Sequence, residues 1–149
     1  MKVKLQIIDK KTSKPKLEEF DAEMILGCFC LHKTLYPEGV SAKTTYSISV
    51  IPLGARFVCG IPWSSVAKRI LKEVLPKLIE SGEIDQAKAR SQDKKISASA
   101  FSEKARAVIG DIEREARTAR TAKDVDLETI LARHIDIKTP PKQVQSSFL

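Results

Sequence analysis

Histidine, glycine, cysteine and aromatic residues are all scarce in this chain of 149 residues. With two histidines and none of the motifs that hold phosphate, zinc or a catalytic serine, the chain offers few groups for a catalytic centre. Three cysteines are too few, and odd in number, for a secreted disulfide scaffold, which favours a reducing compartment. No apolar run approaches the ~18 residues of a membrane span, and the charged amino terminus does not resemble a signal peptide. We therefore expect a cytoplasmic protein that is not an enzyme, needs no cofactor and binds no membrane.

The residues that are present describe an ordinary globular protein with a basic surface. Hydrophobic residues make up 42% of the chain and charged residues 30%, which is enough for one core without disulfides or a structural metal. We expect a single α+β domain over residues 1–139, followed by a C-terminal tail over residues 140–149. The net charge of +7, from 26 Lys and Arg against 19 Asp and Glu, favours a polyanionic partner.

Period-two patterns predict strands in the first part of the chain. Residues 2–8 and 45–50 alternate apolar and polar side chains, as a strand does when one face is in the core and the other in solvent. The turn Pro52–Gly54 predicts a hairpin with a return strand. One face of that return strand is expected to carry Ala55, Phe57, Cys59 and Ile61.

Two further segments complete this region. The lysine-rich residues 9–16 contain Ser, Asp and Pro and are expected to form a solvated loop. Residues 24–32 are continuously apolar, so periodicity alone does not separate a central strand from a buried helix. We interpret them as a strand, because Cys and Phe dominate the run and Gly27 would weaken a helix.

The spacing of apolar residues changes to that of a helix after Trp63. One helical face is predicted to carry Val66, Ala67, Ile70, Leu71, Val74, Leu75, Leu78 and Ile79. Ser64 is a suitable N-cap and Gly82 a suitable C-terminal stop. Pro76 should kink or restart the helix, because its ring clashes with the preceding turn.

Two more helices are expected beyond a polar segment at residues 83–97, which is either irregular or a short helix. The first starts at Ser99 or Ser102 and runs to about Lys123, and the second is capped by Asp124 or Asp126. Strands therefore come first and helices after. This order predicts an α+β fold in which a three- to four-stranded antiparallel sheet is followed by two or three helices packed on one face.

A metal site is the first candidate constellation. Cys28, Cys30 and His32 follow one another at every second residue, Cys59 adds a third thiol, and thiolates and imidazoles suit zinc. Residues two apart on a flat strand, however, are separated by roughly 7 Å at Cα, so convergence on one ion would require a bulge. We therefore interpret the cysteines as small buried hydrophobic residues and His32 as a polar residue at the strand end, and we expect no metal.

Basic residues are the second candidate constellation, for contacts with the phosphates of DNA or RNA. They fall in the predicted loop, on the first helix and on the second helix, as Lys10, Lys11, Lys14 and Lys16; Lys68, Arg69 and Lys72; and Arg114, Arg117, Arg120 and Lys123. Residues three apart drift by about 60° around a helix, so the last set is predicted to form a slanting stripe that can follow a phosphate backbone. The alternative is a set of ordinary solvated faces, partly neutralised by neighbouring acidic residues. Aromatic residues, at 5%, offer little support for base stacking.

The last five residues are the third candidate. Gln145, Ser147, Phe148 and Leu149 resemble the short peptide by which many bacterial replication and repair proteins dock on the sliding clamp, with Ser146 in place of the common Leu. The resemblance implies that this tail binds another protein. The alternative is that Phe148 and Leu149 pack against their own domain, because an exposed apolar pair needs burial.

Two hypotheses of function follow. The first is a small accessory protein that binds nucleic acid, or an assembly that contains it, through its basic loop and helix faces. The second is a protein-binding module, such as a subunit, inhibitor or adaptor encoded by a phage or plasmid, that docks by its helices and tail. In the folded chain, the lysines of residues 10–16 and the basic residues of the first helix should converge on one face under the first hypothesis and scatter under the second.

Overall fold

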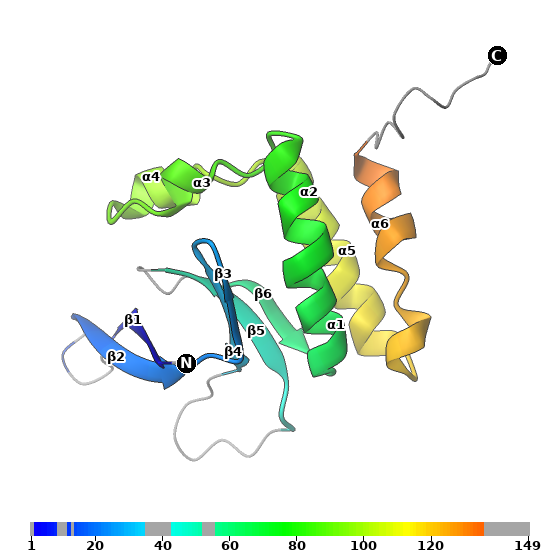
Figure 1. Ribbon diagram of the computed structural model, residues 1–149, viewed down its shortest axis with the longest axis horizontal. Coiled ribbons are helices and arrows are strands. Elements are labelled where there is room, and N and C mark those ends of the chain that lie inside the picture. Colours follow the sequence, from blue (N-terminus) through cyan, green and yellow to red (C-terminus); the bar gives the residue numbers. More distant parts are fainter. Residues whose placement is uncertain (1, 9–11, 13, 35–42, 52–55, 136–149) are drawn as a thin grey trace.

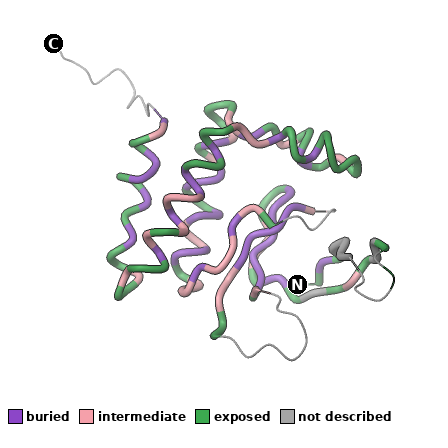
Figure 2. The backbone as a smooth tube through the Cα atoms, turned by 180° about the vertical axis from the view of Figure 1, so that it is seen from behind, coloured by how far each residue is buried: buried purple, intermediate pink, exposed green. Residues whose placement is uncertain are grey.

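The computed structural model describes residues 2–8, 12, 14–34, 43–51 and 56–135. A four-stranded antiparallel sheet lies in the middle, the long helices cover one of its faces, and a two-stranded hairpin lies on the other side (Figure 1). The predicted α+β class, with an N-terminal antiparallel sheet and helices packed on one face, is confirmed. Buried residues concentrate on the central strands and on the inward surfaces of the long helices (Figure 2). In the part of the chain described here, no helix is both long and apolar enough to cross a membrane.

Within the described residues, six strands form two separate antiparallel sheets. The hairpin consists of β1 (Lys2–Ile8) and β2 (Pro15–Asp21). The four-stranded sheet has the order β3-β4-β5-β6. Its strands are β3 (Met24–Leu26), β4 (Phe29–Lys33), β5 (Tyr46–Val50) and β6 (Arg56–Ile61). The strands predicted at residues 2–8 and 45–50 are therefore confirmed.

Two of the sequence predictions about strands are wrong. Residues 15 and 16, expected in a loop, begin β2, where they pair with the end of β1; residues 9–11 and 13 lie outside the described residues. Residues 24–32 form two strands instead of one. The chain turns at Gly27, whose φ of +59° is a conformation that glycine adopts readily and other residues rarely do.

The expectation that β5 has a wet face is also wrong. Ser47 and Ser49, which should have faced solvent, are 0% and 1% exposed. The β1–β2 hairpin lies on this side of the sheet (Figure 1), and Val3, Ala22 and Cys30 form a small second core there. The period-two pattern shows which residues share a face, but it does not show whether a second layer covers the polar face.

A bulge breaks the alternation predicted for the return strand. Tyr46 and Ile48 of β5 pair with Ile61 and Val58 of β6, so two steps on one strand oppose three on the other. Gly60 lies in this bulge with a φ of +73°. As a result Val58 and Ile61 are the fully buried residues of β6, whereas Phe57 and Cys59 are half-buried.

The first long helix has the predicted inward face. It consists of α1 (Ser64–Arg69), the π-helical segment η1 (Ile70–Val74) and α2 (Leu75–Glu80). Leu71 and the other residues of the predicted face are buried, except Ile79, which is half-buried. The predicted N-cap is wrong, because Ser64 is the first helical residue and Trp63 precedes it without a side-chain cap. Gly82 ends this region with a φ of +85°.

Pro76 explains the π-helical segment. Proline has no amide hydrogen, and its ring would clash with the carbonyl of residue 72 in a regular α-helix. The wider turn of η1 directly precedes it, and the Leu75 amide donates to the carbonyl of Ile70, five residues back. The predicted kink or restart at Pro76 is thus confirmed.

The polar segment after Gly82 forms two short helices that stand out from the helical layer as an arm (Figure 1). They are α3 (Gln86–Ala89) and α4 (Lys94–Ala98). A bridge between Ile84 and Phe101 closes the base of the arm.

The last helices form a helical hairpin on the outer side of the first long helix. They are α5 (Glu103–Thr118), the 3-10 turn η2 (Ala122–Asp124) and α6 (Leu127–His134). Ser102 and Asp126 cap α5 and α6 through their side chains, as two of the predicted alternatives state. The prediction that α5 continues to about Lys123 is wrong. The Thr118 hydroxyl donates to carbonyls of the last turn, and Ala119 is extended.

Candidate nucleic-acid interface

The lysines of the first loop lie apart from the basic residues on the helices. Lys14 is exposed beside the hairpin turn, Lys16 belongs to β2, and Lys10 and Lys11 lie outside the described residues. The hairpin is on the far side of the four-stranded sheet from the helices (Figure 1). A single surface therefore does not join Lys14 to the helical sets. For the described residues this is the scatter expected under the second hypothesis, and a nucleic-acid interface is left to the helical sets alone.

The second set lies on the outer side of the first long helix. Lys72 is exposed, and Lys68 and Arg69 are half-buried next to it, because the opposite face of the helix is in the core. The Arg69 side chain is already engaged, since Nε donates to Oε2 of Glu73 at 3.3 Å.

The third set does not form the predicted helical stripe. Arg114 and Arg117 are exposed on α5, but Arg120 follows the end of that helix and Lys123 lies in η2. All four therefore follow a turning chain. Arg114 forms an ion pair with Asp111 on its own helix.

Ion pairs and hydrogen bonds fix α6 against α5. The Asp111 carboxylate contacts Nε2 of His134 at 2.6 Å, and Arg133 donates to Oε2 of Glu115 at 2.9 Å. Arg133 carries no signal in the sequence beyond its charge, because its contact depends on α6 folding back on α5. These pairs neutralise part of the charge on the middle of the helical layer.

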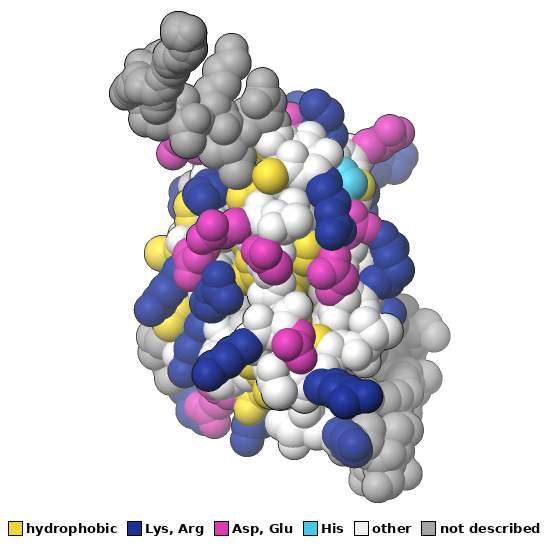
Figure 3. All heavy atoms as spheres, turned by 90° about the vertical axis from the view of Figure 1, so that its right-hand side faces the viewer, with side chains coloured by type: hydrophobic (Ala, Val, Ile, Leu, Met, Phe, Trp, Pro, Cys, Tyr) yellow, Lys and Arg dark blue, Asp and Glu magenta, His cyan; other side chains and the backbone are white. Residues whose placement is uncertain are grey.

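The second and third sets meet at one end of this layer. Thr129, through its hydroxyl and amide, is the main group that lowers the pKa of Asp126, and the guanidinium of Arg69 lowers it further. The segment η1, which directly follows Arg69, contacts α6, and α1 lies at the same end of the helical layer as η2 with Lys123 (Figure 1). In Figure 3, Lys and Arg side chains lie on both sides of a band of Asp and Glu side chains and below it.

Comparison with models of protein families, with curated proteins and with solved structures gives no match.

The residues of the metal candidate do not meet. Cys28 lies in the turn before β4 and packs in the core on the helical side, whereas Cys30 belongs to the small core on the other side. Cys30 and His32 share one face of β4, but the prediction that Cys28 shares it is wrong, because Gly27 and Cys28 form a turn. Among the described residues, no group of three or more His, Cys, Asp or Glu side chains could hold a metal ion. Cys59 instead donates its amide hydrogen to Glu113 on α5.

His32 belongs to a buried polar cluster on the hairpin side of the sheet. Its Nδ1 donates to the Lys33 carbonyl at 2.7 Å, which leaves Nε2 to accept from the Ser49 hydroxyl, also at 2.7 Å. Burial lowers the pKa of His32, in keeping with a neutral ring. This pair has the composition of a nucleophile and its base, but His32 is 2% exposed and Ser49 1%. A substrate does not reach them, so the pair joins β4 to β5.

Burial also governs the thiol on this side of the sheet. It raises the pKa of Cys30 to about 11, so this residue is a neutral thiol at physiological pH. The tail residues Gln145, Phe148 and Leu149 lie outside the described residues, and the predicted docking peptide stays a prediction.

Proposed function

We propose that this chain is a non-catalytic accessory protein that binds the phosphate backbone of nucleic acid at the end of its helical layer. The observation that carries the proposal is that α1 lies at the same end of the helical layer as the C-terminal end of α5 and η2 (Figure 1). It brings the basic residues of the first helix to the same end as those that follow α5. The residues proposed to contact phosphate are Lys68, Lys72, Arg117, Arg120 and Lys123.

These residues are proposed because their charges are not already paired with acidic residues in the described part of the chain. None of the five forms an ion pair with any residue that the structure describes, whereas Arg69 and Arg114 contact Glu73 and Asp111. A cation without a protein partner can neutralise a phosphate and release its condensed counterion, which is the main source of non-specific affinity. Lys14, on the hairpin, is left out because it lies beyond the sheet.

The acidic residues near this end limit the strength of the interaction. Asp124, Asp126 and Glu128 are exposed beside Lys123 and repel a polyanion. A few phosphate contacts with such neighbours support weak binding that does not read sequence, since phosphates carry no sequence information. We therefore propose binding to DNA or RNA by charge alone.

The location of the interface is tested with two triple variants of equal charge change. Arg117→Ala/Arg120→Ala/Lys123→Ala removes three proposed contacts, and Lys88→Ala/Lys94→Ala/Lys95→Ala removes three exposed lysines from the α3–α4 arm. Fluorescence anisotropy with labelled duplexes of about 20 base pairs, at about 50 mM salt, measures affinity where non-specific binding is strong. The first variant should bind on the order of tenfold more weakly or worse, and the arm variant within about twofold of wild type.

The outcomes separate the two hypotheses of function. Equal weakening by both variants would show that net charge, not this end of the molecule, determines the affinity. No binding by the wild-type chain would reject the proposal and leave a protein-binding module as the better account.

A further inference from the structure

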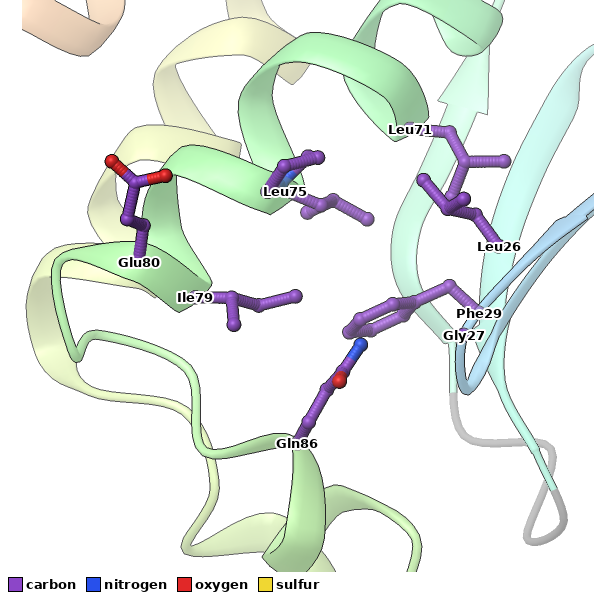
Figure 4. Close-up of a pocket in the computed structure, with 9 residues that line it drawn as sticks. Leu26, Gly27, Phe29, Leu71, Leu75, Ile79, Glu80 and Gln86 are labelled. Atoms are coloured by element: carbon purple, nitrogen blue, oxygen red, sulfur yellow. The ribbon is translucent and has the colours of Figure 1, made fainter.

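An apolar cavity lies between the end of the first long helix, the β3–β4 turn and the start of α3 (Figure 4). Its volume of about 480 Å³ is within the range of sites that hold small organic ligands. Residues from three distant parts of the sequence form its walls. They are Leu26, Gly27, Phe29, Leu71, Leu75, Pro76, Ile79, Glu80 and Gln86.

The polar groups at this cavity are not evenly placed. In Figure 4 the amide of Gln86 points into the cavity towards Phe29, whereas the Glu80 carboxylate points away from it. Gly27 makes this arrangement possible, because a Cβ at that position would stand 2.5 Å from Nε2 of Gln86. The Gln86 amide forms no side-chain hydrogen bond with the residues that the structure describes, so its donors are available to a ligand.

A positive charge stands beside the same wall. The Arg90 guanidinium, at the end of α3, comes within 3.9 Å of the point where a Gly27 Cβ would lie. Burial raises the pKa of the neighbouring Cys28 thiol, and the charge and hydrogen bond of Arg90 partly offset that effect. Arg90 forms no ion pair among the described residues. The cavity therefore has apolar walls and the Gln86 amide, with the Arg90 guanidinium next to the Gly27 wall but not among the lining residues.

We propose that this cavity binds a small organic acid with an apolar body, such as a medium-chain acyl carboxylate. The apolar body would pack against Phe29, Leu75 and Ile79, and the carboxylate would accept from the Gln86 amide and the Arg90 guanidinium. Hydrogen bonds between a carboxylate and a guanidinium are among the strongest available to a ligand of this size. An amine with the same body would be repelled by Arg90, and an alcohol would lose the charge. The site shares no residue with the proposed nucleic-acid interface.

Isothermal titration calorimetry with octanoate, octanol and octylamine, each below its micelle concentration, tests the proposal on the full chain. We expect one octanoate per chain, bound about tenfold more tightly than octanol and more tightly still than octylamine. Arg90→Gln should bring octanoate and octanol to equal affinity. Lys88→Gln, which removes an exposed charge from the same short helix, should leave both unchanged.

A filling variant locates the binding. The side chain of Ile79 points into the cavity (Figure 4), so Ile79→Trp should abolish octanoate binding while far-ultraviolet circular dichroism remains that of the wild type. If that variant fails to fold, Leu26→Trp, at a residue that is 44% exposed, fills the cavity from the turn instead. Absence of binding at millimolar octanoate, octylamine binding as tight as octanoate, or undiminished binding to the filled variant would overturn the proposal.

Discussion

Truncation of Leu71 tests the packing of the first long helix and the cavity beside it in one experiment. Leu71 and Leu78 are both 0% exposed, but only Leu71 lines the cavity. Leu→Ala removes three carbons, which forfeits about 2.4 kcal/mol of transfer free energy at ~0.8 kcal/mol per methylene. A sealed void at Leu78 adds a further cavity term, for a total of about 3–5 kcal/mol. The space left at Leu71 joins an existing cavity, so its loss should be about 2–3 kcal/mol.

Urea denaturation followed by circular dichroism at 222 nm measures both variants. For a slope of about 2 kcal/mol per molar urea, the midpoint should fall by about 1 M for Leu71→Ala and about 2 M for Leu78→Ala, with the slope unchanged. An unchanged midpoint for Leu71→Ala would refute the assignment of the inward helical face. A larger loss for Leu71 than for Leu78 would refute the continuity between Leu71 and the cavity.

Gly27→Ala should lower the melting temperature, because φ at this position is +59° and the new Cβ would lie 2.5 Å from Nε2 of Gln86. Gly110→Ala, inside α5, should raise the melting temperature, because alanine gains about 0.5–1 kcal/mol in helix propensity over glycine. Calorimetry checks both, and a rise for Gly27→Ala would contradict the turn. Burial lowers the pKa of His32 below its ordinary value of about 6.5. The neutral ring therefore stabilises the fold above about pH 6.5. This contribution to the free energy of unfolding is lost as the pH falls towards the folded pKa, by up to about 1.4 kcal/mol per pH unit. Urea titrations of wild type and His32→Gln between about pH 7 and 5 check this. The other histidine, His134, is present in both proteins, so its titration cancels in the comparison. A difference in unfolding free energy between the two proteins that does not vary with pH would contradict a buried neutral ring.

Local patterns in the sequence predicted the elements whose shape depends on their own residues. The inward face around Leu71 follows from 3,1,3,1 spacing, and the break at Pro76 follows from the chemistry of proline. Ser102 and Asp126 were recognisable as caps, because a short side-chain oxygen can accept from the backbone three residues later. Such features need no knowledge of the rest of the fold.

Features that depend on a second segment were not predictable in this way. Ser49 is buried because the β1–β2 hairpin lies on that side of the sheet, and β2 itself is too polar to be recognised as a strand. The placement of α1 and η2 at the same end of the helical layer requires the α5–α6 hairpin to turn at the right residue. The cavity joins the β3–β4 turn to α2 and to Gln86, which lies in a segment without periodicity.

The salt dependence of affinity for nucleic acid is the measurement that tests the proposed function most directly. Each phosphate contact should contribute a slope of about −0.9 on duplex DNA and about −0.7 on single strands, in a plot of log affinity against log salt. Arg117→Ala/Arg120→Ala should flatten the duplex slope by nearly two units and weaken binding to all sequences alike, while the fold is retained. A wild-type chain that binds neither duplex nor single strands at about 50 mM salt, or a slope unchanged by this double variant, would contradict the proposed interface.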